Sequence, residues 1–229
     1  ELLAQINELS ADSSVRAVSI TGAGRAFSSG ADLLDSSGLG ADGIPNFEGE
    51  LVENFNPIVA AIRRAPQPYI AAVNGPAAGI SASIALACDL VAAAESAYFL
   101  LAFVNIGLIP DGGASALIPA RIGFTRASEL SLLGDRLSAS EALQWGLINR
   151  VWPDAEFSDR VAELRTRLAT GPALALARIK QALDEEVFSG VERQLLREAK
   201  LQQELGGSED FREGALAFAQ KRPAKFKGQ

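Results

Sequence analysis

Residues 68–94 read PYIAAVNGPAAGISASIALACDLVAAA, and this stretch indicates the fold class. Near its two ends, Tyr69–Val73 and Leu90–Ala94 are short uncharged apolar runs, a pattern typical of strands buried on both faces. Between them, the turn residues Asn74–Gly79 lead into a predicted helix over Ser81–Cys88, whose small side chains would let it pack close to neighbouring backbone. The order strand, helix, strand predicts an α/β fold with largely parallel strands.

The same alternation of strand and helix continues on both sides of this stretch. A short amphipathic helix begins at Leu2, and a helical pattern over Leu51–Arg64 is interrupted by Pro57. Further buried strands are predicted at Val15–Thr21, Tyr98–Phe99 and Leu147–Val151. Because helical patterns separate most of these strands, they are expected to share one α/β core.

The last part of the chain is predicted to be mainly helical. Ser138 or Ser140 can cap a helix that runs through Trp145. After the strand that follows, apolar residues recur at helical spacing and give each predicted helix one apolar face. These helices should therefore pack on the core or on another subunit. We therefore expect an α/β core over residues 1–153 and a C-terminal helical region over residues 154–229.

The charge balance and the missing residue types exclude several classes of function. The chain has 21 basic and 28 acidic residues, so nucleic acid and anionic membranes would be repelled and an anionic ligand would need a local basic patch. Histidine is absent from the sequence, which excludes a Ser-His-Asp triad and a histidine metal ligand within this chain. We expect no metal site. Polar residues interrupt the longest apolar runs, which do not suit a bilayer span.

Cys88 is the only cysteine, so no disulfide can form within the chain and a reducing, cytoplasmic setting is expected. Its alanine-rich surroundings predict a buried, small apolar side chain rather than a nucleophile. The chain opens at Glu1 without an initiator Met and enters a helical pattern at once. We therefore expect that an N-terminal segment is missing.

A glycine-rich loop follows the first predicted strand. Residues 21–33 read TGAGRAFSSGADL, and their glycines would let a ligand approach the backbone closely. The loop lacks the third glycine of a dinucleotide fingerprint and the Gly-Lys-Ser/Thr of a phosphate loop. Taken alone, the pattern favours an ordinary turn.

Joined to five other motifs, this loop resembles the enoyl-CoA hydratase/isomerase (crotonase) family in order and spacing. The other motifs are AVNGPAAG at 72–79, ACD at 87–89, IGLIPDGG at 106–113, and the segments 142–151 and 218–226. The resemblance covers nearly the whole chain, and only the family's first strands and their loop have no counterpart. It implies a crotonase-like (ClpP/crotonase) spiral of ββα units, a C-terminal helical region that helps to form a trimer, and a pocket for an acyl-CoA.

In that family, two backbone N–H groups hold the thioester oxygen, and the matching positions here are Ala31 and Ile80. Abstraction of a proton next to a thioester pushes charge onto its oxygen, and fixed donors stabilise that enolate without reorganising. Because the donors are main-chain groups, an isoleucine at position 80 is acceptable. Ser81 replaces a glycine common in the family, which puts the geometry around Ile80 in question.

The family's hydratases use two glutamates, and the matching positions here are Ser83 and Phe103. Serine is no general base without a partner, and phenylalanine cannot be one at all, so paired-carboxylate hydration is not expected. Asp111 lies where a subset of family isomerases has its acidic base. It could take a proton from C2 of a 3-enoyl-CoA and return it at C4, giving a 2-enoyl-CoA. The alternative is that Asp111 only caps the helix that begins at Gly112.

The resemblance also implies residues that contact coenzyme A as part of the substrate. These residues are Arg25, Ser29, Asp32, Leu33, Phe218 and Lys221. For Lys221, a solvated helix end is the simpler interpretation.

No metal or redox cofactor is implied, and a homotrimer or hexamer in the cytoplasm is expected. Two alternatives to an isomerase stay open. One is a hydratase or another thioester reaction that uses water held by Asp111 or Ser83, and the other is a non-catalytic acyl-CoA-binding paralogue.

Overall fold

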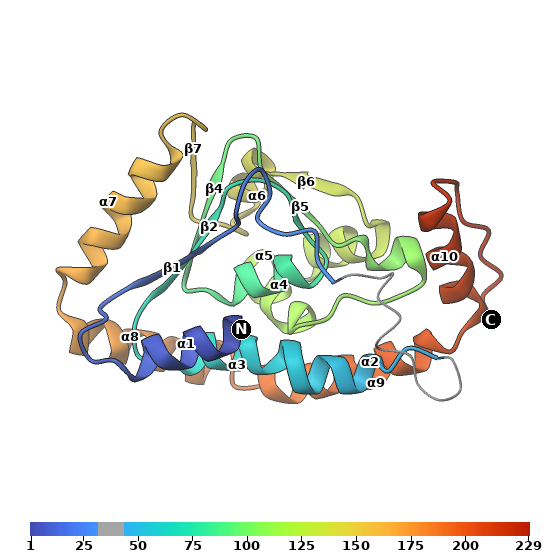
Figure 1. The fold of residues 1–229 in the computed structure, drawn as a ribbon, viewed down its shortest axis with the longest axis horizontal. Coiled ribbons are helices and arrows are strands. Elements are labelled where there is room, and N and C mark those ends of the chain that lie inside the picture. Colours follow the sequence, from blue (N-terminus) through green and yellow to red (C-terminus); the bar gives the residue numbers. More distant parts are fainter. Residues whose placement is uncertain (32–43) are drawn as a thin grey trace.

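The computed structural model describes residues 1–31 and 44–229, and shows two small sheets surrounded by helices (Figure 1). One sheet is parallel throughout, in the order β1-β2-β4-β7. Its strands are β1 (Val18–Thr21), β2 (Tyr69–Val73), β4 (Leu90–Ala94) and β7 (Arg150–Trp152). The second sheet has the order β3-β5-β6, with β3 (Ala77–Ala78), β5 (Tyr98–Leu100) and β6 (Arg136–Ser138). β3 and β5 are parallel and β6 is antiparallel to β5, so the pairing is largely parallel, as predicted.

The predicted strands β2 and β4 are confirmed to the residue, whereas other boundaries differ. The predicted turn 74–79 contains β3, and β6 was not predicted. The strand predicted over Leu147–Val151 begins only at Arg150. Its first residues close the preceding helix instead, because the N–H of Leu147 donates to the carbonyl of Ala142 at 2.9 Å around Gly146, which has a φ of 81°.

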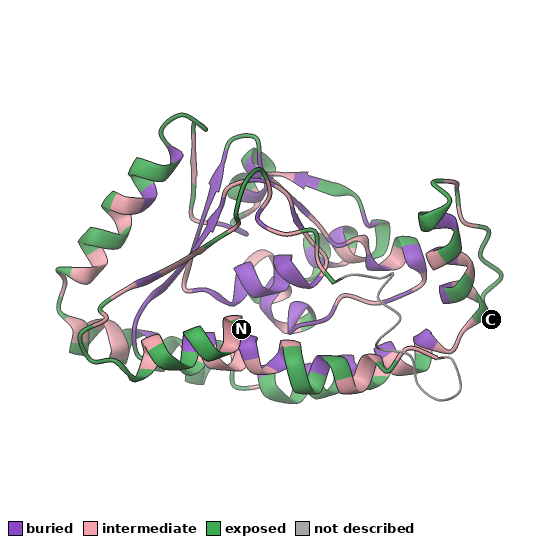
Figure 2. Cartoon of the chain, viewed as in Figure 1, coloured by how far each residue is buried: buried purple, intermediate pink, exposed green. Residues whose placement is uncertain are grey.

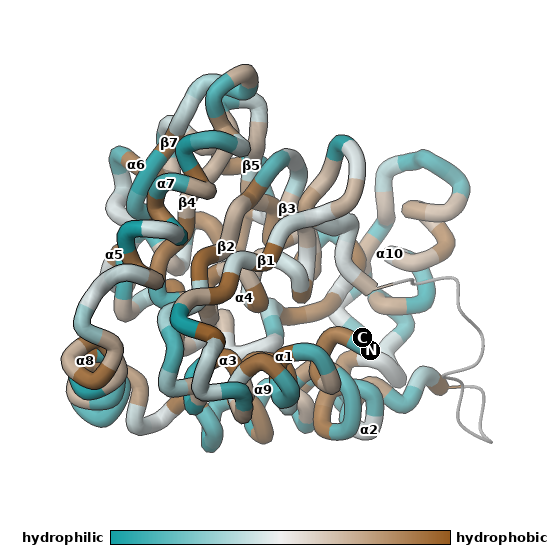
Figure 3. The backbone as a smooth tube through the Cα atoms, turned by 60° about the vertical axis from the view of Figure 1, so that its left-hand side comes forward, coloured by the Kyte–Doolittle hydropathy of each residue, from teal (hydrophilic) through white to brown (hydrophobic). Residues whose placement is uncertain are grey.

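Helix α4 (Ile80–Ala87) is the centre of the core. All eight of its residues are buried, and Figure 2 shows the same burial along β2 and β4. Small side chains make this possible, since alanine and serine let α4 lie close to the strands and to neighbouring helices. Figure 3 shows apolar residues gathered along β2 and α4, while the outer helix α8 (Ala173–Val187) alternates between polar and apolar positions.

The helical segment before β2 runs on through the predicted interruption. It consists of α2 (Phe47–Glu50), a π-helical turn (Leu51–Phe55) and α3 (Asn56–Arg64). Pro57 lies in the first turn of α3, directly after the π-helical turn, in which the N–H of Asn56 still donates to the carbonyl of Leu51. The predicted first helix is also present, as α1 (Leu2–Ala11).

The remaining helices follow β5. A 3-10 turn (Ala102–Ile106) precedes the long helix α5 (Ala114–Leu133). The others are α6 (Ala139–Trp145), α7 (Phe157–Ala169), α9 (Val191–Gly206) and α10 (Glu209–Ala219). Ser138 forms a capping box with Glu141 at the start of α6, which confirms one of the two predicted caps. None of the helices in the described part of the chain is both long and apolar enough to cross a membrane.

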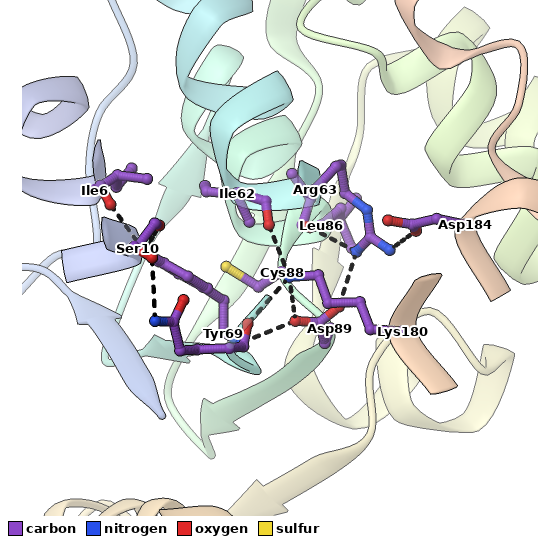
Figure 4. Close-up of polar contacts among 12 residues, drawn as sticks. Ile6, Ser10, Ile62, Arg63, Tyr69, Leu86, Cys88, Asp89, Lys180 and Asp184 are labelled. Atoms are coloured by element: carbon purple, nitrogen blue, oxygen red, sulfur yellow. Dashed lines mark hydrogen bonds and ion pairs between the residues drawn. The ribbon is translucent and has the colours of Figure 1, made fainter. Parts of the chain in front are cut away.

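A partly buried ion cluster joins α8 to the core (Figure 4). Asp89, which follows α4, receives the guanidinium of Arg63 at 3.2 Å and the ammonium of Lys180 at 2.9 Å. It also accepts the N–H of Tyr69 at 2.8 Å, while Arg63 pairs with Asp184 of α8. These charges therefore compensate one another at the junction of α3, β2 and α8. Cys88 is fully buried beside them, as predicted.

Candidate active site

Two loops that are far apart in the sequence lie side by side at the start of α4. The N–H groups of Phe27 and Ser28 both donate to the carbonyl of Pro76, at 3.0 and 3.1 Å, and the N–H of Ala78 donates to the carbonyl of Ser28 at 3.1 Å. Gly30 has a φ of 93°, and a Cβ placed on it would lie 2.9 Å from the carbonyl oxygen of Ala78. Glycine is therefore required there for the loops to approach each other.

This contact brings the segments of the two expected N–H donors together. A Cβ placed on Gly79 would lie 3.9 Å from the Cα of Gly30, so the residues just before Ile80 and Ala31 are neighbours in space. Ile80 is the first residue of α4, and its N–H has no partner within that helix. Ala31 is exposed and is the last described residue of its loop. The predicted contact residues Asp32 and Leu33 lie outside the described residues.

Ser81, which stands where the family commonly has glycine, ties the two loops together. Its hydroxyl is within hydrogen-bonding distance of two carbonyl oxygens, that of Ser28 at 3.0 Å and that of Ala78 at 2.7 Å. A hydroxyl has one hydrogen to donate, so the two carbonyls share it. The substitution therefore adds a link between the loops rather than separating them.

Asp111 lies against the same end of α4. The next residue, Gly112, has a φ of 65°, and a Cβ on it would overlap the side chain of Ile80 and lie 3.0 Å from the Cβ of Ser83. The hydroxyl of Ser83 donates to the main-chain carbonyl of Asp111 at 2.6 Å. The structure thus brings Asp111, Ser83 and Ile80 to one place.

The carboxyl group of Asp111 is buried and has one polar partner on one of its two oxygens. The side-chain amide of Gln202 donates to Oδ2 at 2.7 Å. Oδ1 is buried and has no hydrogen-bond partner within residues 1–31 and 44–229. Burial raises the pKa of Asp111 to about 7, the hydrogen bond from Gln202 opposes this rise, and the charge of Glu198 adds to it. This carboxyl group can therefore both take up and release a proton near neutral pH.

The side chain of Asp111 does not cap α5, so the alternative interpretation of this residue is wrong. The helix begins at Ala114 with Gly113 as its cap residue, and Gly113 has no side chain. Glu198 of α9 supplies the acceptor instead, receiving the N–H of Gly113 at 2.6 Å and that of Ser115 at 2.8 Å. A residue from another helix satisfies the free N–H groups of α5, which leaves Asp111 available for another role.

Ser83 and Phe103 line the same region without offering a base. The hydroxyl hydrogen of Ser83 is directed to a carbonyl, so no neighbouring base activates this serine. The ring of Phe103 lies 3.8 Å from a Cβ placed on Gly79. Between them these residues make this part of the site apolar, which fits the high pKa of Asp111.

The residues expected to contact coenzyme A lie in separate places. Arg25 and Ser29 are exposed in the loop after β1, whereas Phe218 is 62% exposed on α10 and Lys221 follows that helix with a φ of 53°. Figure 1 shows α10 at one end of the molecule. The expected contacts thus come from two segments that are far apart in the sequence.

Glu198 and Gln202 were not among the predicted site residues. Both are 1% exposed and lie on the buried face of α9, together with Leu195 and Ala199. Polar residues repeated at helical spacing within an otherwise apolar face are the sequence feature that could have identified them.

A model of the enoyl-CoA hydratase/isomerase family matches residues 1–229. The chain belongs to the enoyl-CoA hydratase/isomerase family. The match spans both loops of the candidate site, Asp111 and the tail helices, so the family assignment does not rest on a single motif.

Individual members of the family are also similar over nearly the full chain. A probable enoyl-CoA hydratase of Rhodobacter capsulatus is 44% identical over 93% of this chain and 82% of its own length. The 1,2-epoxyphenylacetyl-CoA isomerase of Escherichia coli is 40% identical over 98% of this chain and 86% of its own length. The crystal structure of an enoyl-CoA hydratase from Mycobacterium avium subsp. paratuberculosis is 43% identical, with a TM-score of 0.90, over 99% of this chain and 86% of that one. The crotonase fold expected from the sequence is thereby confirmed.

Proposed function

We propose that this protein is an enoyl-CoA isomerase that converts a 3-enoyl-CoA into a 2-enoyl-CoA. One observation carries the proposal: a buried carboxyl group, Asp111, has a pKa of about 7 and lies beside the N-terminus of α4. A group with this pKa is suited to both halves of a proton transfer at neutral pH.

In the proposed reaction, ionised Asp111 takes a proton from C2 of the substrate. The electrons of that C–H bond form a dienolate that extends from the thioester oxygen to C4. The same carboxyl group then returns the proton to C4, and the double bond ends between C2 and C3. The reaction is redox-neutral, and coenzyme A takes part only as the carrier of the acyl group.

Main-chain N–H groups of Ala31 and Ile80 are proposed to stabilise the dienolate oxygen. The contact between the two loops and the free N–H at the first turn of α4 support this assignment. Loss of one such donor commonly lowers kcat by about 10²- to 10³-fold. Since both donors are main-chain groups, a substitution to proline is the change that removes one.

Hydration of a 2-enoyl-CoA is the competing candidate, because two of the relatives above are named hydratases. The resemblance places Ser83 and Phe103 at the positions of the hydratase glutamates, and neither has a base as partner. Glu198 is a second carboxylate near Asp111, but its oxygens are occupied by donors from α5. These observations favour the isomerase.

Coenzyme A is proposed to contact the loop after β1 through Arg25, Ser29, Asp32 and Leu33, and the tail through Phe218 and Lys221. The 62% exposure of Phe218 on α10 supports a tail that contacts a second subunit. The apolar residues Ile179, Leu183 and Val187 are exposed along one face of α8, as a subunit contact would require. We propose a trimer or hexamer in the cytoplasm, and sedimentation analysis would test the oligomeric state.

The function is tested by incubating the full-length protein with 3-enoyl-CoA and with 2-enoyl-CoA in heavy water. Mass spectrometry follows the products and the deuterium they carry. Wild type should convert the 3-enoyl thioester to the 2-enoyl thioester, and Asp111→Asn should lower kcat by about 10²- to 10⁴-fold. Asp135→Asn is the matched control, because Asp135 is exposed and lies after α5.

Each other outcome points to a different function. Addition of water to the 2-enoyl-CoA by wild type would establish the hydratase instead. Binding of both thioesters without turnover would establish a non-catalytic acyl-CoA-binding protein.

A further inference from the structure

We propose that Gln202 is a positioning residue that holds the carboxyl group of Asp111 by Oδ2 and leaves Oδ1 to carry the proton. The inference rests on the proposed function, because it concerns how Asp111 is prepared for proton transfer. Gln202 lies on α9, outside both loops that form the rest of the site.

The amide of Gln202 is fixed in one orientation by the loop it contacts. Its Nε2 donates to Oδ2 of Asp111 at 2.7 Å, and its Oε1 accepts the N–H of Ile109 at 3.1 Å. Turning the amide over would set its oxygen against the carboxylate and its NH₂ against the N–H of Ile109. Both contacts would then be repulsive, so the amide can only present a donor to Asp111.

A single donor makes the two oxygens of Asp111 unequal. A hydrogen bond stabilises negative charge on the oxygen that accepts it, so charge is favoured on Oδ2. Oδ1 is buried and has no partner in the part of the chain that the structure describes. A proton on Oδ1 leaves the bond from Gln202 intact, whereas a proton on Oδ2 would compete with it. Oδ1 is therefore the oxygen that exchanges protons.

Glu198 acts on the same carboxyl group through its charge. It lies one helical turn before Gln202 and accepts two N–H groups and the hydroxyl of Ser115, so its lone pairs are engaged. The side chains that approach the Asp111–Gly112 turn from α4, Ile80 and Ser83, carry no charge. Glu198 thus opposes ionisation of Asp111, Gln202 favours it, and the balance between these two residues of α9 sets the pH at which Asp111 works.

The test compares Gln202→Met and Gln202→Glu with wild type in the full-length protein. Titration of Asp111 is followed by ¹³C NMR of labelled aspartate, with the signal assigned by its loss in Asp111→Asn. The methionine removes the donor, and the pKa of Asp111 should rise by about one unit. The glutamate adds a like charge when ionised, and the rise should be larger. Because the ionised fraction of Asp111 at pH 7 would fall from about one half to about one tenth, the kcat for isomerisation should fall about five-fold in Gln202→Met, with KM little changed, and should recover as the pH is raised.

Gln203→Met is the matched control, since Gln203 is the next residue of α9 and bonds instead to Glu48 and Pro45 near α2. It should leave the titration of Asp111 unchanged. A pKa of Asp111 that does not move in either Gln202 variant would overturn the inference. So would a rise in KM with an unmoved pH profile, which is the mark of a merely structural role. If the titration shifts as expected but wild type lacks isomerase activity, the positioning by Gln202 is supported and the proposed function fails.

Discussion

Asp89 is half-buried and Asp111 is buried, and the two carboxyl groups lie in opposite electrostatic surroundings. Asp89 is in contact with two cations, Arg63 and Lys180, and also receives a main-chain N–H. Asp111 accepts a hydrogen bond from one neutral amide, and the charge of another carboxylate, Glu198, raises its pKa. The first cluster joins three elements of the fold, and the second lies at the candidate site.

The difference shows how one residue type performs two tasks in the same protein. Where a carboxylate is paired with cations, its removal leaves those cations uncompensated. Without a cation, burial favours the neutral form, so the group titrates near neutral pH. The same substitution, Asp to Asn, should therefore have opposite effects on stability in the two clusters.

The largest effect is expected for Asp89→Asn. The variant leaves the buried Lys180 and the half-buried Arg63 without a full counter-charge, and the free energy of unfolding should fall by about 3–5 kcal/mol at pH 8. Urea denaturation followed by circular dichroism measures this change. A loss below about 1 kcal/mol would show that Asp184 alone compensates both cations.

The next largest effect is expected for Asp111→Asn, and its sign should be the opposite. The pKa of Asp111 is raised in the folded state from its ordinary 3.8 to about 7, so wild type loses stability as the pH rises through this window. Asparagine keeps an acceptor for Gln202 and does not ionise.

The variant should therefore be more stable than wild type at pH 8, by at most about 4 kcal/mol, and should lose this advantage near pH 4. Thermal unfolding across this pH range measures the difference. A difference that does not depend on pH would contradict the assignment of the titrating group.

A smaller effect is expected for Ser115→Ala. The variant removes the hydroxyl that donates to Glu198 but keeps both main-chain donors to this carboxylate. A hydrogen bond to a charged group contributes about 1.5–3 kcal/mol, and we expect a loss at the lower end of this range. Urea denaturation is again the measurement, with Ser140→Ala on the exposed side of α6 as control. Equal stability of the two variants would show that the hydroxyl adds nothing to the cap of α5.

The smallest effect is kinetic and concerns Cys88. Burial, together with the charge of Asp89, raises the pKa of Cys88 to about 12, so the native protein should react with a thiol reagent at pH 8 only when it opens. Labelling followed by mass spectrometry should be faster in Asp89→Asn and no faster in Asp111→Asn. Fast labelling of wild type would mean that the core around α4 opens without breaking the Asp89 cluster.

Sequence patterns predicted best those parts of the protein that depend on local chemistry. Tyr69–Val73 and Leu90–Ala94 are uncharged runs bounded by turns, and both are strands with these limits. The cap at Ser138 was one of two expected from the sequence, because its partner Glu141 lies only three residues away. The start of β7 at Arg150 was not predicted, because it depends on how the residues after Gly146 close α6.

The site was foreseen only where its motifs are continuous in the sequence. Asp111 and the two glycine loops were recognised, but whether Asp111 capped α5 could not be decided from its neighbours. In the structure, Glu198 accepts the free N–H groups at the start of α5, and it lies 83 residues after Ser115 in the sequence. Gln202 was missed for the same reason, because nothing near Asp111 in the sequence indicates which helix will cover it.

The position of Glu198 and Gln202 on α9 also links catalysis to the order in which the chain is made. Gln202 follows Asp111 by 91 residues in the sequence. A chain that is being synthesised can therefore complete its strands before Gln202, the hydrogen-bond donor to Asp111, has been added. Long-range contacts of this kind form late when a chain refolds from denaturant. Recovery of the proposed isomerase activity should then lag behind recovery of the sheet, and its rate would report the docking of a single helix.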